Sequence, residues 1–100
     1  MSLDLLLKAG VDISRLERNT RRGLNTVWVV FDQHGERLVV SSTYEGDHMA
    51  GSLHYGDQAF DVFPPTSNLI EIFNDCASRL GPDWDIVTHK NYWHFEYDPK

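Results

Sequence analysis

The stretch Trp84-Asp-Ile-Val-Thr-His-Lys-Asn-Tyr-Trp-His-Phe-Glu-Tyr97 carries the clearest structural pattern in the sequence. β-Branched and aromatic residues dominate its two halves, and this composition predicts strands over Trp84–Thr88 and Tyr92–Tyr97. Lys90-Asn91 separates the two runs and supplies the turn. We therefore expect an antiparallel pair of strands that closes the domain.

The second of these strands divides its residues between two faces. Because successive side chains of a strand point to opposite sides of the sheet, the aromatic set shares one face and a more polar set shares the other. We expect the aromatic set to line the core against a helix and the polar set to point toward a cleft. The aromatic set is Trp93, Phe95 and Tyr97, and the polar set is Tyr92, His94 and Glu96.

Upstream of this pair, the sequence predicts a further strand followed by a helix. Gln58–Phe63 resembles a strand, and two prolines end it. Thr66 or Ser67 then caps a helix that runs to about Leu80, because apolar residues recur there at helical spacing. Cys76 belongs to the apolar side of this helix, so we expect its thiol to be buried.

The first half of the chain is expected to contribute a short helix and two more strands. Residues 2–9 suit a helix, and residues 13–22 are polar and are expected to form a loop or a frayed helical turn. The runs Asn25–Phe31 and Arg37–Ser42 are dense in β-branched and aromatic residues, which predicts two strands. The hairpin loop between them has Gly35 at a position that needs a positive φ.

Together these elements predict a single α+β domain over residues 1–100, in which residues 1–24 form a helical and polar lead-in. The predicted sheet is small and mainly antiparallel, with flanking helices, and residues 43–53 form a loop. A chain of 100 residues is long enough for one hydrophobic core and too short for two.

Charge and cysteine content exclude several kinds of site. Fifteen acidic residues against nine basic ones give a net charge of −6, which argues against a nucleic-acid-binding groove. A single cysteine excludes an internal disulfide framework and a multi-cysteine metal cluster. No apolar run approaches the roughly 18 residues of a membrane span. The N-terminal stretch has no signal-peptide pattern, so we expect synthesis in the cytoplasm.

Three side chains, His54, Asp61 and His94, form a candidate zinc site. Donor atoms of one zinc ion lie within roughly 3.5 Å of one another, and seven residues of strand would separate two backbones by about 23 Å. The chain must therefore fold back between His54 and Asp61, where Gly56 and Asp57 supply a turn. Two histidines, one carboxylate and an open position match a catalytic zinc site. The same spacing also fits an Asp61 that stabilises a turn beside two surface histidines.

Two stretches of the chain resemble motifs of one enzyme group. Ser52-Leu-His54-Tyr-Gly-Asp-Gln-Ala59-Phe-Asp61 is similar to the Ser-x-His-x-x-Gly-x-Ala-x-Asp motif of zinc peptidases related to D-Ala-D-Ala carboxypeptidases. Tyr92-Trp-His-Phe-Glu96 resembles their second motif, which carries the last zinc ligand. The wider group joins lysostaphin-type enzymes, D-Ala-D-Ala peptidases and the hedgehog signalling domain, and small phage members end much as this chain does. The likeness covers about residues 26–98.

The resemblance implies a zinc-dependent peptidase with a hedgehog-like or D-Ala-D-Ala-peptidase-like fold. Zn²⁺ would be held by His54, Asp61 and His94, with an open position for water. The implied substrates are stem peptides of bacterial peptidoglycan, cleaved as by a carboxypeptidase or an endolysin. The candidates for contact with substrate are Ser52, Tyr44 and Trp93.

The chain departs from the family pattern where the catalytic base belongs. That carboxylate usually lies three residues before the second histidine, and here the residue is Asn91, whose amide cannot accept the proton of the attacking water. Tyr44 is followed by Glu45, where many members have a substrate-holding arginine. Asn91 is a candidate to orient water or stabilise an oxyanion, and Glu96 and Glu45 are the candidate bases. Glu96 is equally suited to orient a ligand imidazole.

These departures keep an alternative open. The chain would then be a catalytically impaired zinc-binding protein that retains the peptidase fold for a structural or binding role in a virus particle, with virion proteins as partners. A metal-free binding module is a third hypothesis, and it requires the motif match to be accidental.

Overall fold

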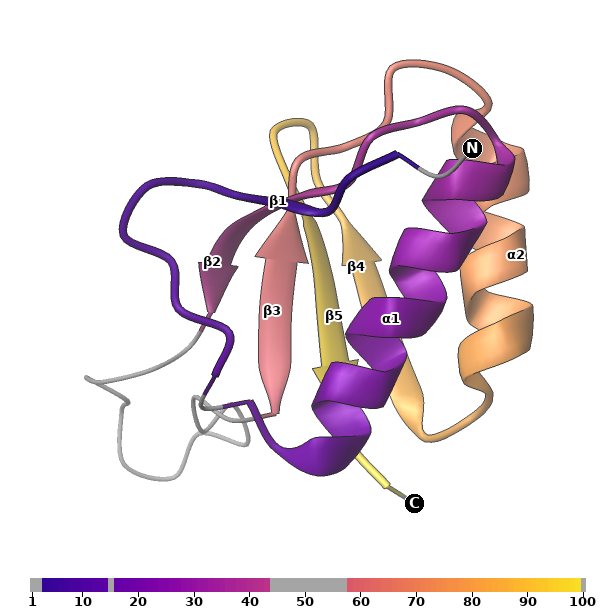
Figure 1. The fold of residues 1–100 in the computed structure, drawn as a ribbon. Coiled ribbons are helices and arrows are strands. Elements are labelled where there is room, and N and C mark those ends of the chain that lie inside the picture. The colour runs from indigo at the N-terminus through magenta and orange to yellow at the C-terminus, as the bar shows by residue number, and fades with distance from the viewer. Residues whose placement is uncertain (1–2, 15, 44–57, 100) are drawn as a thin grey trace.

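The computed structural model describes residues 3–14, 16–43 and 58–99. In this part of the chain, two helices pack on one face of a five-stranded sheet (Figure 1). This arrangement is an α+β fold, as the sequence predicts. None of the helices in these ranges is long and apolar enough to cross a membrane. The elements are β1 (Leu6–Leu7), α1 (Arg18–Gln33), β2 (Val39–Thr43), β3 (Ala59–Val62), α2 (Leu69–Leu80), β4 (Trp84–Thr88) and β5 (Trp93–Tyr97).

The strand order of the sheet is β1-β2-β3-β5-β4. Only the short β1 pairs in parallel, with β2, and the other three pairings among the described strands are antiparallel. The prediction of a mainly antiparallel sheet is therefore confirmed. Helix α1 connects the parallel strands β1 and β2, whereas α2 leads from β3 to β4 with β5 inserted between those two strands.

The predicted hairpin at the C-terminal end is confirmed. Trp84 pairs with Tyr97 at one end of the hairpin, and Thr88 pairs with Trp93 at the other. A backbone hydrogen bond of 2.9 Å from His89 N to Tyr92 O closes the turn that holds Lys90 and Asn91.

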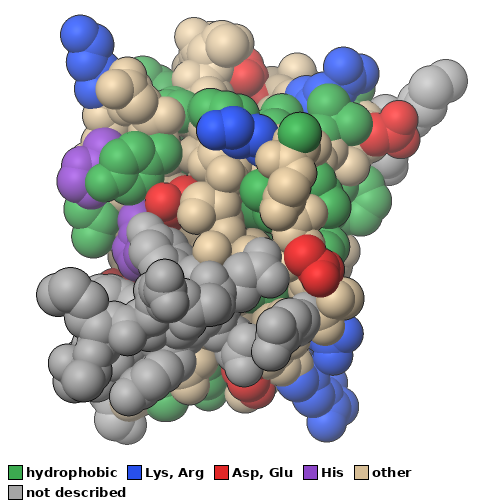
Figure 2. Space-filling model, turned by 90° about the vertical axis from the view of Figure 1, so that its left-hand side faces the viewer, with side chains coloured by type: hydrophobic (Ala, Val, Ile, Leu, Met, Phe, Trp, Pro, Cys, Tyr) green, Lys and Arg blue, Asp and Glu red, His purple; other side chains and the backbone are tan. Residues whose placement is uncertain are grey.

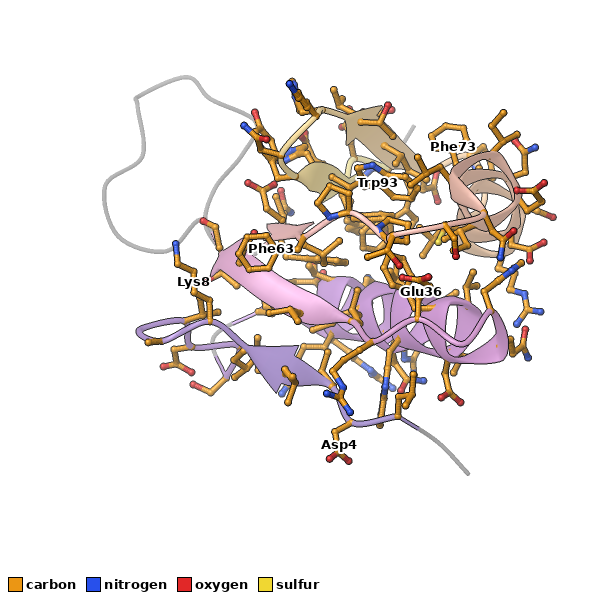
Figure 3. All side chains as sticks on the ribbon, turned by 90° about the horizontal axis from the view of Figure 1, so that it is seen from above. Asp4, Lys8, Glu36, Phe63, Phe73 and Trp93 are labelled. Atoms are coloured by element: carbon orange, nitrogen blue, oxygen red, sulfur yellow. The ribbon has the colours of Figure 1, made fainter. Side chains whose placement is uncertain are left out.

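The core lies between the sheet and the two helices. Trp93 contacts Phe31 of α1 and Phe73 of α2 edge to face, with ring centroids 6.2 and 6.3 Å apart, and Figure 3 shows Trp93 and Phe73 side by side. On the same face, Phe95 stacks on Phe60 of β3 at 5.2 Å. Cys76 is fully buried, as expected, and burial raises the pKa of its thiol to about 12. We call this side of the sheet the helix-covered face.

The predicted strand over Asn25–Phe31 is wrong, because this run lies in helix α1. Leu24, Val27 and Phe31 are buried at helical spacing, whereas Asn25 is exposed. Packing of this stripe outweighs the strand preference of β-branched residues. The sequence predicts a loop or a frayed helical turn over residues 13–22, and residues 18–22 of this segment form the start of the same helix. The helix begins after Glu17, whose carboxylate accepts a hydrogen bond of 3.0 Å from Asn19 N.

Because α1 is a helix, the predicted hairpin loop is instead the end of that helix. Gly35 has a φ of +73°, so the positive φ is confirmed. Glu36 then accepts hydrogen bonds of 2.8 Å from Thr66 N and 2.9 Å from Ser67 Oγ. Partial burial by itself would raise the pKa of Glu36, but these hydrogen bonds outweigh it and lower that pKa. Thr66 and Ser67 therefore bind Glu36 rather than cap α2, whose N-cap is Asn68.

The predicted helix over residues 2–9 is also wrong, because residues 3–9, which the structure describes, contain no helix. Leu6 and Leu7 form β1, and Leu6 N donates a hydrogen bond of 2.9 Å to Leu38 O. Lys8 N continues the pairing with a bond of 2.9 Å to Val40 O. Of the predicted loop over 43–53, residues 44–53 lie outside the described residues.

Gly23 of α1 provides a test of this packing. The indole ring of Trp84 lies directly against Gly23, where a β-carbon would overlap ring atoms Cζ2 and Cη2. Helix propensity alone would favour Gly23→Ala by about 1 kcal/mol, but overpacking costs about 1–3 kcal/mol. We expect Gly23→Ala to lower the free energy of unfolding, as measured by urea denaturation. The exposed control Asn25→Ala should be neutral or slightly stabilising, and a Gly23→Ala protein as stable as the wild type would contradict the predicted overlap.

Candidate metal centre

Asp61 and His94 lie directly opposite each other on the neighbouring strands β3 and β5. Their side chains point away from the helix-covered face, because Phe60 and Phe95 pair in the next register position and point toward it. Asp61 Oδ1 and His94 Nδ1 are 2.7 Å apart. The structure therefore joins two of the three predicted zinc ligands. We call this side of the sheet the open face, and no helix from the described part of the chain packs on it.

Glu96 completes a row of three polar side chains on the open face. It lies two residues beyond His94 on β5, and its Oε1 is 3.2 Å from His94 Nε2. The exposed fractions of Asp61, His94 and Glu96 are 7%, 9% and 4%, so all three are nearly as buried as the core. Buried polar groups are stable only when hydrogen-bonded, and these three satisfy one another at least in part. Figure 2 shows histidine and acidic side chains close together on this side of the molecule.

The two carboxylates favour a charged imidazole. Burial by itself would lower the pKa of His94, but the hydrogen bonds and negative charges of Asp61 and Glu96 outweigh it and raise that pKa. Without a metal ion, the ring can donate one proton to each carboxylate. A metal ion would have to displace one of these protons, which makes binding stronger at higher pH.

The residues present fit a zinc ion. Carboxylate oxygen and imidazole nitrogen are both zinc donors, with bond lengths of about 2.0–2.2 Å. The 2.7 Å between Asp61 Oδ1 and His94 Nδ1 needs to open by less than about 1 Å for both atoms to bind one ion. These two residues would supply one oxygen and one nitrogen ligand.

The third predicted ligand, His54, lies outside the described residues, and so do Tyr44, Glu45 and Ser52. Their predicted roles as ligand, substrate contact or base therefore remain predictions. Asn91 is exposed in the turn between β4 and β5, three residues before His94.

The proposed substrate contact at Trp93 needs correction. Its side chain is 4% exposed and lies on the helix-covered face, whereas His94 lies on the open face. Alternation along β5 causes this separation, because neighbouring residues of a strand point in opposite directions. Trp93 borders an apolar hollow of about 350 Å³ beside α2, on the other side of the sheet from Asp61.

Sequence reasoning missed two further clusters. Asp85 of β4 pairs with Glu96, and together with Asp98 they place three carboxylate oxygens within 4.8 Å of one another, an arrangement that could hold a cation. The other is a histidine–aspartate pair between the C-terminal end of α1 and the middle of α2, in which His34 Nε2 lies 2.7 Å from Asp75 Oδ2. The partners are 41 residues apart, so no local pattern could have indicated that pair.

No protein-family model matches this chain, and no curated protein sequence matches it. A function can therefore be proposed for this chain only from the geometry of the open face and from the sequence motifs.

The raised pKa of His94 predicts a pH dependence of stability. The folded protein binds this proton more tightly than the unfolded chain does, so the stabilisation is complete below the unfolded value near 6.5 and is lost as pH rises through the folded value. For the metal-free protein with chelator present, we expect the free energy of unfolding to fall as pH rises above about 6.5, until the folded-state pKa of His94 has been passed. Each unit of difference between the two pKa values is worth about 1.4 kcal/mol.

Urea denaturation across this pH range measures the effect. His94→Gln should flatten the dependence, whereas His89→Gln, which removes an exposed histidine of the β4–β5 turn, should preserve it. An unchanged dependence in His94→Gln would contradict the assignment to His94.

Proposed function

We propose that this protein is a zinc-dependent peptidase that cleaves stem peptides of peptidoglycan. The observation that carries the proposal is the pairing of Asp61 and His94, whose donor atoms lie 2.7 Å apart on the open face of the sheet. The motif around Asp61 supplies His54 as the third ligand, and the family resemblance supplies the substrate class and a hedgehog-like or D-Ala-D-Ala-peptidase-like fold.

The chain's own residues define what the site does. Asp61 and His94 come from adjacent strands, so the sheet holds their relative positions with little freedom, as a metal centre requires. Two histidines and one carboxylate leave one ligand position open for reaction. When bound there, zinc would supply the Lewis-acid chemistry that polarises a peptide carbonyl and makes water a stronger acid.

One observation favours the alternative of an impaired zinc-binding protein of a virus particle. Asn91, at the place of the usual base, is exposed and carries no carboxylate. Among the described residues near the imidazole, the carboxylates that bind it are those of Asp61 and Glu96. A zinc-loaded protein that cleaves no stem peptide, with either Asn91 or a carboxylate at this position, would support the alternative.

Zinc content tests the metal site. After loading and dialysis, elemental analysis of the wild type should give about one equivalent of zinc. Loss of a ligand's hydrogen-bonding partner weakens metal binding by about 10–100-fold. Loss of a ligand itself should weaken zinc binding more than this, as in His54→Ala, Asp61→Ala and His94→Ala. His34→Ala and Asp75→Ala are matched controls, because they break a histidine–aspartate contact of the same 2.7 Å length elsewhere. Negligible zinc in the wild type would refute the site.

Cleavage of muropeptides that end in D-Ala tests the reaction. General-base catalysis contributes about 10²–10⁴-fold, so we expect Asn91→Glu to raise the cleavage rate by an amount in that range. Asn91→Gln has similar size without the charge and should leave the rate unchanged. Equal rates for the Glu and Gln variants would show that this position does not limit the reaction.

A further inference from the structure

The imidazole of His94 is held from both sides. Its Nδ1 lies 2.7 Å from Asp61 Oδ1, and its Nε2 lies 3.2 Å from Glu96 Oε1. The two ring nitrogens point away from each other, so the two carboxylates lie at opposite edges of the ring. One metal ion bound to the ring therefore has either Asp61 or Glu96 beside it, not both.

Strand geometry decides which side is suited to a shared ion. Asp61 is on β3, directly across from His94, where a ligand from a neighbouring strand can bind the same ion. Glu96 follows on the same strand as His94, with one residue between them. An ion shared by Asp61 and His94 must then bind Nδ1 of the imidazole. The other ring nitrogen, Nε2, keeps its proton and donates a hydrogen bond to Glu96.

A small, apolar neighbour lies beside Glu96 on β3. The residue paired with Glu96 there is Ala59, whose buried methyl side chain has no polar atom that could compete for the ring nitrogen of His94. On the β4 side of Glu96 lie Asp85 and Asp98, with carboxylate oxygens within 4.8 Å.

We propose that Glu96 is a positioning residue of the metal site. Its carboxylate accepts the hydrogen bond from Nε2–H of His94, which fixes the ring and makes Nδ1 the metal-binding nitrogen beside Asp61. Because the ring separates Glu96 from Nδ1, Glu96 is not the base that takes a proton from the attacking water. This inference rests on the zinc site of the proposed function.

The direct readout is the side-chain ¹H–¹⁵N NMR spectrum of the zinc-loaded, ¹⁵N-labelled protein, with His94→Gln used to assign the His94 signals. We expect His94 to carry its proton on Nε2 and the metal on Nδ1. A proton on Nδ1 with zinc on Nε2 would overturn the inference even if the protein cleaves peptides.

Substitutions test the role of the carboxylate through zinc affinity measured by calorimetry. Glu96→Ala removes the acceptor and should weaken zinc binding by about 10–100-fold. Glu96→Gln keeps an acceptor oxygen and should stay within about tenfold of the wild type. The double variant Asp85→Asn with Asp98→Asn removes the neighbouring carboxylates and should preserve binding. Loss of binding in that double variant would place the ion among the acidic residues and overturn the inference.

The same Glu96→Gln protein separates a positioning residue from a base. A base would lose about 10²–10⁴-fold in cleavage rate with unchanged zinc affinity, and that result would overturn the inference. Zinc on Nδ1 without any peptide cleavage would refute the proposed peptidase and leave the role of Glu96 supported. A wild type that binds no zinc would refute both. Thermal unfolding of each variant checks that the fold is retained.

Discussion

The register between β3 and β5 is the constraint on which the rest of this structure depends. Pairing of Asp61 with His94 places the polar row on the open face, and pairing of Phe60 with Phe95 places the aromatic rings under the helices. A slip of one residue would exchange the two sets, because side chains alternate along a strand. The slipped sheet would bury a charged row against α1 and α2 and expose two phenylalanines. The same strand register therefore both forms the core and assembles the site.

The helices contribute to the site by where they pack. Both α1 and α2 lie on the helix-covered face, so apolar burial is concentrated on one side of the sheet. The opposite side is then available for polar chemistry. The polar row there is still closely surrounded, since Asp61, His94 and Glu96 are less than one-tenth exposed. A buried imidazole between two carboxylates is expensive without mutual hydrogen bonds, and such an arrangement is a common mark of a functional site.

The C-terminal half of the fold and the strand predicted over Arg37–Ser42, which is β2, could be predicted from sequence, whereas the elements before residue 34 could not. In Trp84–Thr88 and Trp93–Tyr97, composition, alternation and turn residues all favour the same hairpin, and the structure has it. In Asn25–Phe31, β-branched content favours a strand while Leu24, Val27 and Phe31 follow helical spacing. Local preference is worth a few tenths of a kcal/mol per residue, so burial of a whole helical stripe outweighs it. The parallel pairing of Leu6 with Val39 involves residues too far apart for any local pattern to indicate.

The sequence by itself determined the hairpin, helix α2, and the side of β5 to which each residue belongs, because these depend on short-range periodicity. It also singled out Asp61 and His94 as partners, since motif and alternation both favour them. Only the tertiary structure decided that Glu96 binds the second ring nitrogen, that Trp93 lies on the face opposite the site, and that α1 replaces a predicted strand. Each of these depends on which segments pack against one another, and that choice is made by the free energy of the whole fold.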